Sequence, residues 1–215
     1  MDKKLDLIIL KLADERSKKV IFLSHCILNE NTRYFGGACC KGINTDFLKD
    51  LLTMDCGVVQ LPCPEQLVWG GIYKKLLWLP MGAGKRPAYY LLRLVYPLFL
   101  LYTKCRFHRL ASKTVSLLRD YMSNGFEVVG ILGVDGSPSC GVNKTLSMKK
   151  AFDYFAGLSV DSLERDDFNR RLYENCIESG QGIFMKALEK KMVRGKKSIP
   201  FTAIDLEKEL SEPRM

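Results

Sequence analysis

The chain has 215 residues, of which 47% are hydrophobic and 27% are charged, and its formal net charge is +9. This length and composition are those of a globular protein with room for one full hydrophobic core, and they exclude a wholly disordered chain.

Secondary structure in the first half of the chain is predicted from short apolar runs, which indicate strands, and from apolar residues at helical spacing, which indicate helices. The strands are continuously apolar rather than alternating, as buried parallel strands are. The expected elements are a helix at residues 4–13, a strand at 19–24, a helix at 45–54 with Thr45 as its N-cap, and a strand at 57–61.

The second half opens with a long apolar segment that we expect to be helical around Pro87 and Pro97. The further expected elements are a helix at 113–123, a strand at 127–132, a helix with a loop at 161–180, a helix at 181–193 and a strand at 199–204. This alternation predicts one α/β domain over residues 1–215, with a mainly parallel, Rossmann-like sheet flanked by helices. Residues 74–119 exceed a minimal crossover, so we expect them to form a helical, basic and apolar insertion or lid.

The positive charge of the chain is concentrated in residues 74–119, which contain ten Lys or Arg residues and no Asp or Glu. The rest of the chain is close to neutral. A field of one sign suits an anionic partner such as RNA, a nucleotide or an acidic membrane surface, although a solvated basic face is the alternative.

Neither the cysteines nor the apolar segments indicate secretion or a membrane span. The apolar run at residues 7–10 is broken at once by Lys11, so it is too short for a signal-peptide core. Residues 88–102 are the most apolar stretch, but they are fewer than the roughly 20 that a spanning helix needs. They suit a core helix, a lid or an interfacial anchor. We therefore expect reduced thiols and a cytoplasmic protein.

Three of the eight cysteines, Cys26, Cys63 and Cys140, each follow a predicted strand. Because the carboxyl ends of parallel strands meet at one edge of a sheet, these cysteines are expected to converge. Each is expected in a tight turn, where glycine and proline fix the loop and free backbone N–H groups to face a sulfur-rich anion. The turns are His25-Cys26, Pro62-Cys63-Pro64 and Ser139-Cys140-Gly141.

Converging soft thiolates favour an iron–sulfur cluster or zinc. Structural zinc usually takes four ligands in paired C-x-x-C spacing, which is absent here. Three thiolates suit a cluster with one iron left open for substrate. On spacing alone, three unrelated buried thiols remain the alternative.

Three ordered motifs raise the case for a cluster. They are Cys26-Ile27-Leu28-Asn29 with Arg33-Tyr34-Phe35-Gly36-Gly37, then Cys63-Pro64-Glu65, then Ser137-Pro138-Ser139-Cys140-Gly141. Together they resemble the pattern of the 2-thiouracil desulfurase (desulfidase) family, which has C-hydrophobic-L-G with RYDGG, then CPE, then SPSCG. The resemblance extends over residues 20–141.

The resemblance implies a [4Fe–4S] cluster held by Cys26, Cys63 and Cys140. It also implies a non-redox reaction in which the open iron binds the sulfur of a thiocarbonyl substrate, water attacks the carbon and sulfide leaves. The implied substrate is a thiolated nucleobase, nucleotide or other small molecule. The sequence departs from the family at Asn29, where a glycine is usual, and at Phe35, where an aspartate is usual. These departures indicate a different substrate pocket.

Around the three cysteines, Glu65 is the first candidate for a general base or proton shuttle, with capping of a helix after Pro64 as the alternative. Ser137 and Ser139 are candidates for hydrogen bonds to substrate or cluster sulfur, or only shape the turn. Candidate substrate-binding residues are Arg33, which suits an anionic group, Tyr34 and Asn29.

The remaining thiols and His25 receive weaker predictions. Cys39 and Cys40 are either ordinary thiols or a persulfide carrier or sulfur acceptor. Cys56, Cys105 and Cys176 are expected to be structural. His25 precedes a ligand position, but in a strand its side chain points to the opposite face, which argues against a catalytic role.

Three functions follow from these observations. The first is a cluster-dependent desulfurase, whose basic segment 74–119 guides a nucleotide or RNA substrate. The second is a non-catalytic iron–sulfur or metal-binding accessory protein, which needs the three cysteines but not Glu65. The third is a protein anchored to a membrane surface through residues 88–102.

Overall fold

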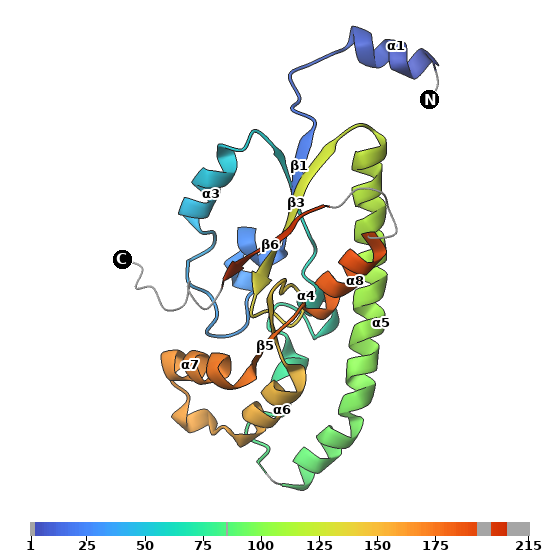
Figure 1. Cartoon of the computed structure of the whole chain (residues 1–215). Helices are drawn as coiled ribbons and strands as arrows, with labels where there is room; N and C mark the ends of the chain where they lie inside the picture. The colour runs from blue at the N-terminus through green and yellow to red at the C-terminus, as the bar shows by residue number, and fades with distance from the viewer. Residues whose placement is uncertain (1–2, 85, 193–198, 206–215) are drawn as a thin grey trace.

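The structure is a computed structural model, and it describes residues 3–84, 86–192 and 199–205. It is an α/β fold in which helices flank a mainly parallel sheet and one helix extends along the whole body (Figure 1). The predicted fold class is therefore confirmed.

The main sheet has four strands in the order β2-β1-β3-β6, and all three neighbouring pairs are parallel. Leu23 at the end of β1 lies beside Gln60 of β2 and Leu132 of β3, so the strands point the same way and share one carboxyl edge. The strands are β1 (Lys19–Leu23), β2 (Gly57–Gln60), β3 (Glu127–Asp135) and β6 (Phe201–Asp205).

Alternate residues of β1 pack into two separate apolar cores, one on each face of the sheet. Val20 and Phe22 belong to the larger core, which includes side chains of α5 (Pro87–Ser123) and α8 (Ile183–Met192). Ile21 and Leu23 belong to the smaller core, which includes Leu51 of α3 (Thr45–Leu52). The continuous apolar run of β1 follows from this burial on both faces.

The other elements surround the carboxyl edge of the sheet or lie outside the core. A second, two-stranded antiparallel sheet pairs β4 with β5. The elements outside the main sheet, α3, α5 and α8 are α1 (Lys3–Lys11), α2 (His25–Leu28), η1 (Glu30–Thr32), α4 (Pro64–Val68), η2 (Lys75–Trp78), β4 (Lys144–Leu146), α6 (Met148–Gly157), η3 (Val160–Ser162), α7 (Arg165–Cys176) and β5 (Ile177–Ser179).

Helix α5 begins with Pro87 at its first turn, runs through Pro97 and ends before Asn124 and Gly125. Its carboxyl-terminal half packs into the larger core through Phe107 and neighbouring residues, whereas its amino-terminal half carries many exposed apolar side chains. None of the helices that the structure describes combines the length and apolar character needed to span a membrane.

The predicted elements are largely confirmed, with three corrections. Strand β3 extends to Asp135, three residues beyond the predicted end, because it continues to pair with β6. Asn44, not Thr45, caps α3, since its Oδ1 accepts a hydrogen bond from the Phe47 amide at 3.2 Å. Helix α6 and the β4–β5 sheet were not predicted.

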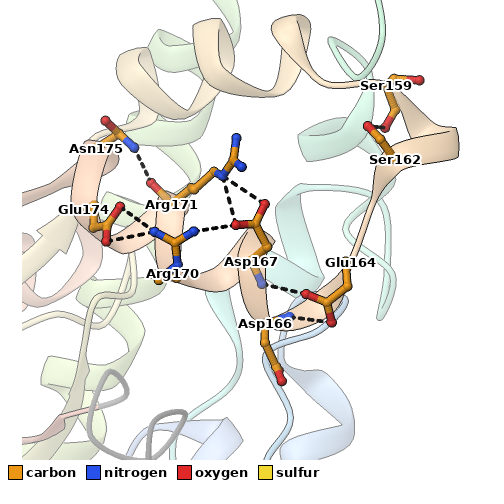
Figure 2. A network of polar contacts seen from close by, with 9 residues as sticks. All are labelled: Ser159, Ser162, Glu164, Asp166, Asp167, Arg170, Arg171, Glu174 and Asn175. Carbon is orange, nitrogen blue, oxygen red and sulfur yellow. Dashed lines mark hydrogen bonds and ion pairs between the residues drawn. The ribbon is translucent and has the colours of Figure 1, made fainter.

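Helix α7 is held at its start by Glu164, whose carboxylate accepts hydrogen bonds from the amides of Asp166 and Asp167. Figure 2 shows this cap and the ion pairs that Asp167 forms with Arg170 and Arg171 along the same helix. All these groups are exposed to solvent, which screens them, so the network caps and solubilises α7 rather than forming a site.

The larger core predicts a contrast between adjacent leucines of α5. Leu118→Ala removes a fully buried side chain and is expected to lower the free energy of unfolding by about 2–5 kcal/mol. Leu117→Ala makes the same change at a residue that is 42% exposed, and is expected to alter it by only about 0.5 kcal/mol. Urea denaturation of both variants tests this. Equal losses would contradict the packing of α5 against the sheet.

Candidate functional site

One pocket at the carboxyl edge of the main sheet collects eight of the nine predicted site residues. They come from segments far apart in the chain, namely the loops after β1, β2 and β3. The residues are Cys26, Arg33, Tyr34, Cys63, Glu65, Ser137, Ser139 and Cys140. The convergence predicted from the strand ends is therefore present.

Each cysteine is positioned by a different local structure. Cys26 lies in α2, the short helix directly after β1. Cys63 is the N-cap of α4, and its Sγ accepts a hydrogen bond from the Gln66 amide at 3.4 Å. Cys140 lies in the loop after β3, where its amide donates to Ser137 Oγ at 3.0 Å. All three sulfurs are thus attached to short, hydrogen-bonded backbone segments.

The loop that carries Cys140 is closed at its base by Asp135. The carboxylate of Asp135 accepts hydrogen bonds from the amides of Val142 and Asn143, each at 2.8 Å, and of Lys144 at 3.2 Å. Burial alone would raise the pKa of Asp135, but these hydrogen bonds outweigh it and lower the pKa. Asp135 therefore remains ionised and fixes the loop.

The same loop is held from its other side by the start of α8. The Ser139 carbonyl accepts hydrogen bonds from the amides of Phe184 and Met185, both at 3.1 Å. Gly182 packs so closely that a Cβ there would lie 2.4 Å from the Ser139 carbonyl carbon. Only glycine fits this position without moving the cysteine loop.

Burial raises the pKa of all three thiols, that of Cys63 to about 12. The nearby sulfurs of Cys26 and Cys63 raise the pKa of Cys140 further. The three sulfurs are therefore close enough to repel one another as thiolates. Without a bound cation they are protonated at neutral pH, and a thiophilic metal would have to displace these protons.

Ser24 adds an unsatisfied polar group beside the sulfurs. Its hydroxyl is fully buried and has no hydrogen-bond partner among the described residues, yet it lies near enough to Cys140 to lower the pKa of that thiol. A buried hydroxyl without a partner is costly, so this donor suits an acceptor beside Cys140.

Glu65 is the centre of a buried polar network. Its Oε1 accepts hydrogen bonds from Ser139 Oγ at 2.7 Å and Ser137 Oγ at 2.9 Å, and its Oε2 lies 2.9 Å from Lys74 Nζ. It does not cap α4, because the Sγ of Cys63 has that role. Ser139 Oγ also lies 3.4 Å from Cys140 Sγ, so this hydroxyl links the carboxylate to the sulfur.

Lys74 is a site residue that the sequence reasoning missed. It follows Gly70 and Gly71, which have positive φ angles, and itself has a left-handed backbone. This turn brings its side chain, only 3% exposed, back onto Glu65. In the sequence, the glycine pair indicates a turn at this point, but Lys74 is only one of the ten basic residues of segment 74–119.

Glu65 and Lys74 are both ionised in this structure. Burial by itself raises the pKa of Glu65, but Lys74 and the two serines together lower it below its usual value. Burial likewise lowers the pKa of Lys74, but Glu65 and the neighbouring sulfur of Cys63 raise it. The pair is therefore a buried carboxylate–ammonium contact.

Of the three predicted substrate-binding residues, two line the pocket and one lies outside it. Arg33 lines the pocket and pairs with buried Glu30 at 3.3 Å. Tyr34 also lines it and donates from its hydroxyl to Asn169 Oδ1 at 2.9 Å. Asn29 lies outside the pocket, where its side chain caps η1 by accepting from the amide of Asn31.

Cys39 and Cys40 are not among the pocket-lining residues. Their amides donate to Glu30 Oε2 at 2.6 and 2.8 Å, so this segment is tied to the same buried carboxylate that holds Arg33. They therefore contact the pocket indirectly, through Glu30 and its ion pair with Arg33.

The prediction for His25 was wrong in its reasoning. It assumed that His25 continues a strand, but this residue begins α2 and lines the pocket. Its Nδ1 lies 3.2 Å from the Leu61 carbonyl oxygen, which makes Nδ1 the protonated nitrogen in the neutral ring.

The remaining wall of the pocket is mainly apolar and was not predicted from the sequence. It comes chiefly from η2, α6 and α7, outside the three motifs. Its residues include Leu77, Phe155, Leu172 and Tyr173. A polar, sulfur-rich floor therefore faces an apolar wall.

Within the described residues, no three His, Cys, Asp or Glu side chains are arranged to hold a single metal ion. In a multi-iron cluster the thiolates bind different iron atoms, so that arrangement is not the one that such a cluster needs.

Comparison with known proteins gives one relative. The chain is 24% identical over 147 residues to a protein of Methanocaldococcus jannaschii that is described as uncharacterized, and the match covers 67% of this chain and 83% of that protein. No protein-family model matches the chain, and no solved structure matches it. The likeness provides no activity that can be transferred.

The buried pair predicts a rescue by double substitution. Lys74→Met leaves Glu65 buried without its cation and is expected to cost about 3–5 kcal/mol of unfolding free energy. Glu65→Gln combined with Lys74→Met removes both charges and is expected to recover most of that loss. Lys75→Met, at the exposed neighbouring lysine, is the matched control and is expected to be neutral. Additive losses in urea denaturation would contradict the pairing.

Proposed function

We propose that the chain is an iron–sulfur-dependent desulfurase of the cytoplasm, which removes sulfur without redox change from a thiolated nucleobase or another thiocarbonyl small molecule. The observation that carries this proposal is the meeting of three cysteines with the Glu65–Lys74–serine network in one pocket. The motif resemblance supports the same function.

The residues present fit a [4Fe–4S] cluster held by Cys26, Cys63 and Cys140. Three soft thiolate donors and no fourth cysteine line the pocket, which leaves one iron without a protein thiolate. The free hydroxyl of Ser24 can donate to a sulfur beside Cys140. Arg33 and Lys74 both favour the thiolate form of Cys26, and their positive charges would offset an anionic cluster.

The overall reaction converts a thiocarbonyl and water into a carbonyl and hydrogen sulfide. The carbon–sulfur double bond breaks, oxygen from water replaces sulfur, and both water protons end on the sulfide, so no electron donor is needed. When bound, the cluster would supply a Lewis acid for the substrate sulfur.

The chain itself supplies proton transfer and positioning. Glu65 is ionised and can accept a proton from water through the Ser139 hydroxyl, which already bridges Glu65 and Cys140. Lys74 remains protonated and stabilises negative charge near the carboxylate. The apolar wall formed by Leu77 and Phe155 limits access of bulk water.

The chain differs from the family pattern at Phe35, which follows the pocket residue Tyr34 but does not itself line the pocket. This ring is 54% exposed, stacks on Tyr73 at 5.3 Å and lies 5.5 Å from Trp78. An aromatic ring in place of the family's aspartate removes a carboxylate from this position. We therefore propose the thiocarbonyl class rather than one named compound.

Cluster binding predicts a selective dependence on three thiols. Protein purified without oxygen is expected to contain about four irons and four sulfides per chain. Cys26→Ala, Cys63→Ala and Cys140→Ala are each expected to lose the cluster and its visible absorption. Cys176→Ala is the control, because Cys176 is also buried but lies outside the pocket. A wild-type chain that binds only zinc would overturn the proposal.

Catalysis predicts that Glu65→Gln keeps the cluster but loses sulfide release from thiolated pyrimidines by about 10²–10⁴-fold. Glu65→Gln leaves Lys74 without its carboxylate and is expected to lower the stability of the fold. The serine hydroxyls can still donate to the amide oxygen, so the iron content of the folded variant is expected to be unchanged. Glu178→Gln, at an exposed glutamate, is the control. Iron-loaded wild type that releases no sulfide from any thiocarbonyl tested would instead support the non-catalytic accessory function.

A further inference from the structure

Helix α5 carries a row of exposed apolar side chains along its amino-terminal half, which we call the apolar stripe. Its members are between 44% and 75% exposed in the chain as described. They are Leu91, Leu94, Val95, Leu98, Leu101 and Tyr102.

The apolar stripe follows helical spacing, with steps of three, four and seven residues from Leu91, so its members lie on one face. The inward face is also apolar, since Phe99 packs near Trp69, and Tyr96 packs against Phe152. A helix that is apolar on both faces is normally covered on both. A continuous exposed patch of this kind marks an interaction surface.

Basic residues continue the same outer face beyond the apolar stripe. Arg106, Arg109 and Lys113 are exposed and follow Tyr102 by four, seven and eleven residues, which keeps them on the stripe's side of α5. No acidic residue occurs anywhere in residues 74–119. The partner of this face must therefore accept apolar side chains at one end and positive charge at the other.

A second copy of the chain does not meet that requirement. In a parallel pairing of α5 helices, Arg106 and Arg109 meet their own copies. In an antiparallel pairing centred on the apolar stripe, they meet the segment around Arg86, which is also basic. Both arrangements place like charges together. Nucleic acid suits the arginines but not the exposed leucines.

We infer that the outer face of α5, from Leu91 to Lys113, binds the surface of an anionic phospholipid bilayer. The apolar stripe enters the boundary between headgroups and acyl chains, and Arg106, Arg109 and Lys113 contact the anionic headgroups. This inference goes beyond the proposed function and does not depend on it, because none of these residues lines the three-cysteine pocket.

The apolar stripe also lies beside a groove that leads toward the site. Val95 belongs to both the stripe and this groove, which continues through Leu92 and Phe99 between η2, α5 and α6. Leu77 and Phe155 form a wall shared by the groove and the three-cysteine pocket. Docking through α5 thus places this groove beside the bilayer, with the wall formed by Leu77 and Phe155 between the groove and the three-cysteine pocket.

The test is co-sedimentation of the full chain with vesicles. Binding to phosphatidylcholine vesicles that contain phosphatidylglycerol is expected to exceed binding to pure phosphatidylcholine by about tenfold at low salt, and to weaken as salt rises. Leu94→Glu with Leu98→Glu is expected to reduce binding by about tenfold or more. Arg106→Glu with Arg109→Glu is expected to abolish the preference for anionic vesicles.

The matched control lies near the amino terminus, where Leu10 and Leu12 are 74% and 72% exposed. Leu10→Glu with Leu12→Glu adds the same charge at the same exposure, and is expected to leave vesicle binding unchanged. Circular dichroism and thermal melting are expected to be unaffected in all three variants, because every substituted side chain is exposed.

Four results would overturn the inference. The first is vesicle binding that survives both α5 variants, and the second is binding that is lost only in the Leu10 and Leu12 variant. The third is the absence of any preference for anionic vesicles. The fourth is a dimer in light scattering that Leu94→Glu with Leu98→Glu dissociates, in a chain that does not bind vesicles. Binding to single-stranded RNA that Arg106→Glu with Arg109→Glu abolishes, in a chain that binds no vesicles, would assign the face to nucleic acid.

Discussion

The buried carboxylate of Glu65 is the contact on which the site depends. A charge removed from water is stable only when cations and hydrogen-bond donors surround it. Lys74, Ser137 and Ser139 meet this need, and they belong to two other loops. The requirement to satisfy one carboxylate therefore joins the loop after β2, the glycine turn and the loop after β3. Cys63 and Cys140 lie on two of these loops, so the same contact also sets where their sulfurs stand.

The parallel sheet supplies the frame for this network. Because β1 lies between β2 and β3 and all run the same way, the residues that follow each strand come together at one edge. Asp135 and the start of α8 then restrain the last of the three loops. Hydrogen bonds restrain the pocket on the side of Cys140, and apolar residues of α6 and α7 line its other side. Such a division, with a few polar groups facing an apolar wall, is typical of small-molecule pockets.

The sequence predicted the polar half of this site better than its apolar half. Cys26, Cys63, Cys140 and Glu65 follow strands directly, so local pattern and motif were sufficient to place them together. Phe155 and Leu172 come from helices far along the chain, where helical spacing shows only that a residue is buried, not what it faces. The error for His25 has another origin: β1 ends at Leu23 and His25 begins α2, so the alternation of a strand does not set the direction of its side chain.

The sequence by itself determined the α/β class, the strands and the three cysteines that follow them, because hydrophobic period and turn residues act over a few neighbouring positions. Only the tertiary structure decided the order β2-β1-β3-β6, the pairing of Lys74 with Glu65 and the exposure of the apolar stripe on α5. These features depend on which distant surfaces pack together. The sequence does not distinguish which apolar residues at 88–102 are buried, because all are apolar. Packing covers one face of the helix and leaves the other exposed to solvent.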